Sequence, residues 1–201
     1  STENLKSSLS IYDSVVVSIP ESYLMAEAQF RLGEIQFKII EDFDKAINLY
    51  HSSLSNNPHL ELKKKNILRI ADVLIAKGND KNSIAFLDSV YKQYPFPQIK
   101  NKLIETHLFT GNPDTALVLL NKVFSEINSM NDSFNDLMEV RDMINFYYSE
   151  VDENEKNVFK EFLKIEYLLK QRKIYEANKK LEFVINNNKN SKLTPTLLLR
   201  R

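Results

Sequence analysis

A four-part pattern that recurs five times constrains the fold of this chain more than any other feature. In each copy, a small residue is followed by a large apolar residue at offset 4, an apolar or small residue at offset 7 and a helix-breaking position at offset 12. Offsets of 4 and 7 fall on one face of an α-helix, so each copy predicts a helix that packs closely against a neighbour. The copies begin at Ser8, Ala46, Ser83, Ala116 and Ala177.

Apolar residues between these copies also recur with the period of an α-helix. Ile67, Ile70 and Leu74 share one helical face, and the sustained alternation typical of strands is absent. Helix starts are marked chemically as well, because Asp152 and Glu155 have the spacing of a capping box. The small residues that begin the copies are 38, 37, 33 and 61 positions apart, and the last gap is close to two repeats. The sequence therefore predicts an all-α chain of repeated helical units.

Composition excludes several common kinds of site. The only glycines, Gly33, Gly78 and Gly111, are too scattered for a phosphate-binding loop. The absence of Cys excludes thiol nucleophiles, disulfides, iron–sulfur clusters and thiolate zinc sites. With 27 basic and 27 acidic residues the net charge is zero, which argues against nucleic-acid binding. No apolar run approaches the roughly 20 residues of a membrane span.

The histidines offer no pattern typical of catalysis or metal binding. His107 is flanked by Leu103 and Leu108, as expected of a packed helix residue, and His51 and His59 are too sparse for a metal site with three or four ligands. A catalytic triad is defined by geometry rather than by spacing, but no glycine lies beside a candidate serine as in a nucleophile elbow. We therefore predict a chain without catalytic residues, metal or cofactor.

Residues 22–58 resemble the tetratricopeptide repeat, a helix–turn–helix unit of about 34 residues. The Leu-Gly pair of the family's first helix is Leu32-Gly33 in this chain. The small and aromatic positions of the second helix are Ala46 and Tyr50, and the closing proline is Pro58. One extra residue in the turn departs from the family pattern.

The resemblance implies a right-handed α-solenoid of antiparallel helix pairs, with about ten helices in one superhelical domain over 1–201. The expected parts are a partial repeat at 5–20, repeats at 22–58, 64–95, 97–128 and 158–189, an irregular long helix at 129–157, and the start of a further helix at 193–201. Since both ends expose an apolar flank in this arrangement, we expect a fragment of a longer repeat protein or self-association through the solenoid ends.

The resemblance also implies a face that binds a partner. In solenoids of this family the first helix of each pair lines the concave groove. The family's groove positions correspond to Phe30, Arg31, Glu34, Phe37, Lys38, Arg69, Asp72, Asn101, Lys102 and Glu105. Their mixed charges and two aromatic rings favour an extended peptide or a helix as the ligand. Phe30 and Glu34 replace the lysine and asparagine that family members use to clamp C-terminal carboxylates, so a chaperone tail is not the expected ligand.

The predicted function is that of a non-catalytic scaffold that binds a peptide or protein partner in the groove. One alternative is a structural arm of a larger bacterial envelope or secretion assembly, with contacts through the 132–151 helix and the termini. Another is a substrate-recruiting domain of an enzyme whose catalytic part lies outside this chain. A third is a groove that is buried against a neighbouring domain. The segment from Pro20 to Gly33 is also similar to envelope-associated bacterial members of the family, such as the repeat lipoprotein of the outer-membrane assembly machine, which favours the periplasm or cell envelope over the cytoplasm.

Overall fold

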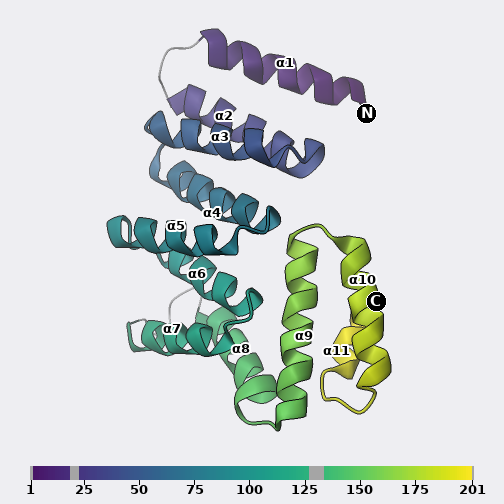
Figure 1. The fold of residues 1–201 in the computed structure, drawn as a ribbon. Coiled ribbons are helices and arrows are strands. Elements are labelled where there is room, and N and C mark those ends of the chain that lie inside the picture. Colours follow the sequence, from purple (N-terminus) through teal and green to yellow (C-terminus); the bar gives the residue numbers. More distant parts are fainter. Residues whose placement is uncertain (1, 19–22, 127–133, 201) are drawn as a thin grey trace. The chain divides into compact units, whose positions relative to one another are not determined.

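The computed structural model describes residues 2–18, 23–126 and 134–200 of the chain (Figure 1). The chain forms two compact units, Ser1–Lys100 and Asn101–Arg201. Regular structure in the described ranges is helical throughout and contains no strand, which confirms the predicted all-α fold of adjacent helix pairs. Pro20 and the first residues of the predicted 129–157 segment lie outside the described ranges.

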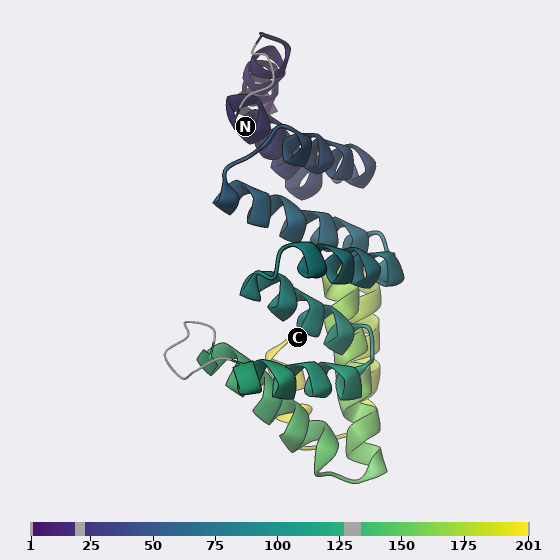
Figure 2. The same cartoon turned by 90° about the vertical axis from the view of Figure 1, so that its left-hand side faces the viewer.

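From α1 to α5, the first unit is a row of helices in which each packs against the next in the chain (Figures 1 and 2). Its helices are α1 (Thr2–Ser18), α2 (Tyr23–Ile35) with its π-helical continuation η1 (Gln36–Ile40), α3 (Phe43–Ser55), α4 (Leu60–Ala76), α5 (Asp80–Gln93) and the first residues of α6 (Pro97–Phe109). Because short turns join consecutive helices, α2 to α5 run in alternating directions.

Turn residues fix where the helices of the first unit begin and end. The side chains of Asp42 and His59 accept hydrogen bonds from the backbone N–H groups of Lys45 (3.0 Å) and Leu62 (3.2 Å), which caps the N-termini of α3 and α4. Gly78 has a φ of 76° in the turn after α4, where its N–H donates to the carbonyl of Ile75 (2.9 Å). This left-handed conformation suits a glycine at the end of a helix.

The recurring sequence pattern forms the core between neighbouring helices. Ala46, Tyr50 and Ser53 are fully buried on α3. The Ser53 hydroxyl donates to the carbonyl of Ala26 (2.7 Å) and accepts from Nδ2 of Asn66 (2.9 Å), so one chain of hydrogen bonds links α2, α3 and α4. A small polar residue at this third position therefore holds three helices together.

Gly33 allows the closest approach between α2 and α3. A Cβ atom at Gly33 would lie 2.6 Å from Cε1 of Tyr50, which is closer than side chains tolerate. We therefore expect Gly33→Ala to lower the free energy of unfolding by about 1–2 kcal/mol, although alanine has the better intrinsic helix propensity. Urea denaturation followed by circular dichroism measures this loss. In a Tyr50→Leu background, the narrower leucine side chain leaves room for the added methyl group, so Gly33→Ala should lower the free energy of unfolding less. An equal loss in the Tyr50 and Tyr50→Leu proteins would contradict the steric explanation.

The second unit continues the helical architecture around a separate core. It contains the remainder of α6, α7 (Pro113–Glu126), α8 (Phe134–Ile144) with its π-helical continuation η2 (Asn145–Ser149), α9 (Glu153–Lys170), α10 (Ile174–Asn187) and α11 (Thr194–Leu199). The pattern copies on α7 and α10 are again buried, as Ala116, Leu120 and Ala177 show. Phe159 is completely buried in this core, between the rings of Tyr147 and Phe162.

The segment 129–157, expected as one long irregular helix, contains a break. The helical run of α8 and η2 ends at Ser149, and α9 begins at Glu153. The carboxylate of Asp152 accepts a hydrogen bond from the backbone N–H of Glu155 at 2.9 Å, which confirms the predicted N-cap and gives the break its physical reason.

In the part of the chain that the structure describes, no helix combines the length and apolar character needed to cross a bilayer.

Candidate partner-binding site

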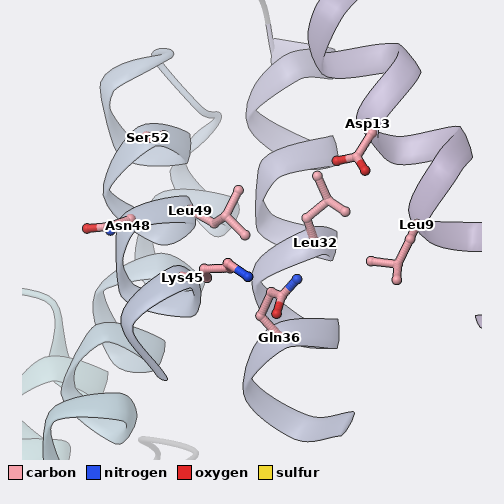
Figure 3. Close-up of a pocket in the computed structure, with 8 residues that line it drawn as sticks. All are labelled: Leu9, Asp13, Leu32, Gln36, Lys45, Asn48, Leu49 and Ser52. Carbon is pink, nitrogen blue, oxygen red and sulfur yellow. The ribbon is translucent and has the colours of Figure 1, made fainter. Parts of the chain in front are cut away.

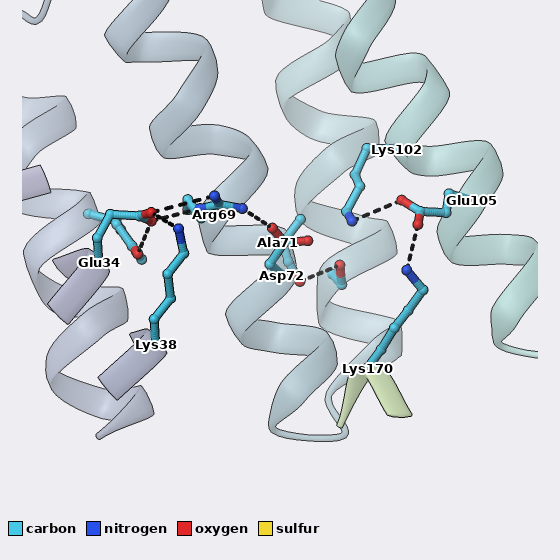
Figure 4. A network of polar contacts seen from close by, with 10 residues as sticks. Glu34, Lys38, Arg69, Ala71, Asp72, Lys102, Glu105 and Lys170 are labelled. Atoms are coloured by element: carbon cyan, nitrogen blue, oxygen red, sulfur yellow. Dashed lines mark hydrogen bonds and ion pairs between the residues drawn. The ribbon is translucent and has the colours of Figure 1, made fainter. Parts of the chain in front are cut away.

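Four charged candidates of the first unit form one network (Figure 4), whereas Arg31 pairs with Glu27 outside it. Glu34 on α2 accepts a hydrogen bond from Nε of Arg69 on α4 at 2.7 Å. Arg69 also donates from Nη1 to Asp72 at 2.8 Å, while Lys38 forms an ion pair with Glu34. The network therefore connects α2 and α4, the first helices of two neighbouring pairs.

A buried tyrosine on α3 forms a hydrogen bond to this network. The hydroxyl of Tyr50 on α3 donates to Oε1 of Glu34 at 2.7 Å. Burial opposes ionisation of Glu34, but hydrogen bonds from Lys38, Tyr50 and Arg69 outweigh it and hold the pKa of Glu34 below its ordinary value. Burial, together with the bond to the carboxylate of Glu34, raises the pKa of Tyr50. Glu34 is therefore a fixed negative charge at neutral pH, and Tyr50 is a neutral donor.

The two aromatic candidates are largely buried in the core of the first unit. Phe30 is 5% exposed, and its ring centroid lies 5.6 Å from that of Tyr50. Phe37 is 9% exposed and packs edge-on against Phe43, with the two ring centroids 5.9 Å apart. Both rings lie beside the core stripe of α2 and η1, so burial of their apolar surface draws them inward.

A hollow of about 260 Å³ opens beside the network, between α2 and α4. Arg31, Glu34 and Phe30 contribute from α2, so the edge of one buried ring still reaches it. Lys65, Leu68 and Arg69 contribute from α4. Lys65 and Leu68 are not among the residues predicted for the groove. A helical period counted back from Arg69 could have found Lys65, which lies four residues before it on the same face.

The candidates of the second unit form a separate cluster of charges. On α6, Lys102 Nζ lies 2.9 Å from Oε2 of Glu105, and Lys170 of α9 reaches Oε1 of the same carboxylate at 2.6 Å (Figure 4). Lys170 also lies over the ring of Phe109, 4.4 Å from its centroid. Burial would raise the pKa of Glu105, but these two lysines lower it below the ordinary value. Asn101 is half-buried and takes no part in this cluster.

A second hollow of the first unit contains none of the predicted residues. It has a volume of about 310 Å³ and lies where α1, α2 and α3 meet (Figure 3). Leucines from the three helices form its apolar wall, and the polar side chains include Asp13, Gln36 and Lys45. Within the described ranges no group of three or more His, Asp or Glu side chains could hold a metal ion.

The comparisons with known proteins agree with the repeats seen in the first unit. Residues 27–59 and 66–96 match the family model described as Tetratricopeptide repeat. These ranges contain the whole Glu34 network and all residues that line the hollow between α2 and α4 except Lys65.

Among solved structures, the chain is similar to one in the structure of Naa15/Naa10 bound to HypK-THB. The sequence identity is 15% and the TM-score is 0.44, and the likeness covers 98% of this chain and 31% of that chain. The chain thus spans about a third of the length of the protein it matches. None of the curated proteins compared with the chain matches it.

Proposed function

We propose that this chain is a non-catalytic scaffold that binds a peptide or protein partner on its α2–α4 face. This face consists of Arg31, Glu34, Lys65, Leu68 and Arg69, the side chains that surround the hollow together with the edge of Phe30. The observation that carries the proposal is the hollow itself, which lies between the first helices of two consecutive tetratricopeptide repeats.

The Glu34 network prepares this face for binding. Arg69 is held at both ends of its guanidinium, by Glu34 at 2.7 Å and by Asp72 at 2.8 Å. Side chains that are already ordered lose less conformational entropy when a partner binds. Leu68, which is half-buried, adds an apolar surface in the middle of these charges. Such a combination of fixed charge and apolar contact suits peptide recognition.

Filling the hollow should abolish binding without changing any charge. We expect Leu68→Trp to place an indole ring in the hollow and to reduce capture of the partner by about tenfold or more, because the partner can no longer enter. Affinity purification from the native lysate, with quantitative mass spectrometry of the captured proteins, measures this loss.

A matched variant shows whether the loss is specific to the face. Val118 on α7 is 67% exposed, so Val118→Trp adds an indole to the surface elsewhere. Val118→Trp should capture the same partner as the unchanged chain, and both variants should retain the helical circular dichroism signal. Equal capture by Leu68→Trp and the unchanged chain would refute the proposal.

A second candidate function, a structural arm in a larger assembly, is favoured by exposed aromatic residues of the second unit. Phe146 in η2 is 54% exposed, and Tyr175 and Phe183 on α10 are 80% and 67% exposed. Exposed aromatic side chains are common anchors in protein interfaces. On this alternative, Phe183→Ser would lose the partner and Leu68→Trp would keep it. The envelope setting, recruitment for an enzyme and self-association through the ends remain predictions from the sequence.

A further inference from the structure

We infer that the hollow of the α2–α4 face binds the acidic side chain of an extended peptide, with an apolar side chain of the same peptide resting on Leu68. This inference rests on the proposed function and specifies the chemistry of the partner. It concerns a side-chain carboxylate within a segment of a protein and not the carboxylate at a chain end.

Cations outnumber carboxylates among the residues that line the hollow. Arg31, Lys65 and Arg69 line the hollow, and Glu34 is the carboxylate among its lining residues. Glu34 already accepts from Arg69 and Tyr50 and pairs with Lys38, so its charge is balanced by its own neighbours. A cationic ligand would therefore have to compete with these bonds for the Glu34 carboxylate.

Two of the cations are available to a ligand. Lys65 is exposed and forms no ion pair with any described residue, and the nearby carboxylate of Glu61 is paired with Lys64 at 2.8 Å. Arg31 pairs with Glu27 at 2.8 Å, but the two side chains are 53% and 38% exposed. An ion pair so open to water contributes little free energy, so Arg31 can turn to a ligand carboxylate at small cost.

The apolar part of the hollow sets the second requirement. Leu68 and the edge of Phe30 line the same hollow as the cations. In an extended peptide, alternate side chains point to the same side, so an acidic residue and an apolar residue two positions later can enter together. The carboxylate then meets Lys65 and Arg31, while the apolar side chain covers Leu68.

A direct test uses labelled peptides whose two ends are blocked. The probe repeats the order Glu-Ser-Leu-Ser, and matched peptides carry Gln or Lys in place of Glu. Fluorescence anisotropy with the full chain should show binding of the Glu peptide, and at least about tenfold weaker binding of the Gln and Lys peptides. Raising the ionic strength should weaken binding of the Glu peptide, because exposed charges are screened by salt.

Charge reversal of the chain completes the test. Arg31→Glu combined with Lys65→Glu should weaken binding of the Glu peptide by about tenfold or more. Lys81→Glu combined with Lys92→Glu changes the net charge equally at exposed sites on α5 and should leave binding unchanged. Equal binding by these two double variants would overturn the inference, as would equal binding of the Glu and Gln peptides.

The two remaining outcomes separate this inference from the function on which it rests. A Gln peptide with a free C-terminal carboxylate that bound as tightly as the blocked Glu peptide would assign the hollow to a chain end, which overturns the inference. If Leu68→Trp abolished capture of the native partner while the Glu peptide failed to bind, the scaffold function would stand and the acidic ligand would be wrong.

Discussion

Replacing Tyr50 with alanine should lower the free energy of unfolding of the first unit by about 3–5 kcal/mol. Tyr50 is completely buried, fills the space beside Gly33 and packs against Phe30. Its loss leaves a cavity between α2 and α3 and takes a hydrogen-bond donor from the ionised Glu34. Hydrogen exchange resolved along the sequence should show the largest loss of protection in α2, α3 and α4.

Two further variants separate the contributions of the Tyr50 ring and its hydroxyl. Tyr50→Phe removes only the donor and should cost about 1–2 kcal/mol, because Arg69 and Lys38 still satisfy Glu34. Tyr23→Ala makes the same change as Tyr50→Ala at a side chain that is 64% exposed, and it should cost less than about 0.5 kcal/mol. Similar losses for Tyr50→Ala and Tyr23→Ala would contradict the role assigned to Tyr50.

Replacing Phe159 with alanine should destabilise the second unit by a similar amount, about 3–5 kcal/mol. Phe159 is completely buried. Its ring centroid lies 6.1 Å from that of Tyr147 and 6.3 Å from that of Phe162. Truncation therefore removes both buried area and ring contacts at the centre of this core. Thermal and urea unfolding followed by circular dichroism should both show the loss.

Phe183→Ala is the matched control for Phe159→Ala. It makes the same chemical change on α10, where the side chain is 67% exposed, and should alter the free energy of unfolding by less than about 0.5 kcal/mol. If Phe159→Ala and the unchanged protein had the same unfolding midpoint, the claim that Phe159 lies in the core of the second unit would be wrong.

The helical pairs could be predicted because the sequence repeats the physical requirement for packing two helices closely. Ala46 and Tyr50 on α3, like Ala116 and Leu120 on α7, are fully buried at the predicted positions. A small residue followed by a large one at offset 4 leaves few other ways to bury both side chains. The cap at Asp152 was equally predictable, since its bond to the backbone of Glu155 is local.

The residues of the α2–α4 face were less predictable, because they depend on contacts between distant segments. Glu34 and Arg69 were identified as candidates, but their ion pair joins residues 35 positions apart. Lys170 reaches Glu105 across 65 positions, and one sequence contains no signal for that pairing. Phe30 and Phe37 are buried, because the rotation of a helix about its axis decides whether a ring points into the core. The sequence period shows which residues share a face of a helix, but it does not show how the helix is rotated about its axis against its neighbours.

Photo-crosslinking tests the central claim most directly. Benzoylphenylalanine is placed at Leu68, in the hollow of the α2–α4 face, and in separate proteins at Val118 and at Phe183. After irradiation in the native lysate, mass spectrometry identifies the crosslinked proteins. We predict one dominant partner crosslinked from position 68 and absent from positions 118 and 183. A partner crosslinked from position 183 and not from position 68 would contradict the claim that this face binds it.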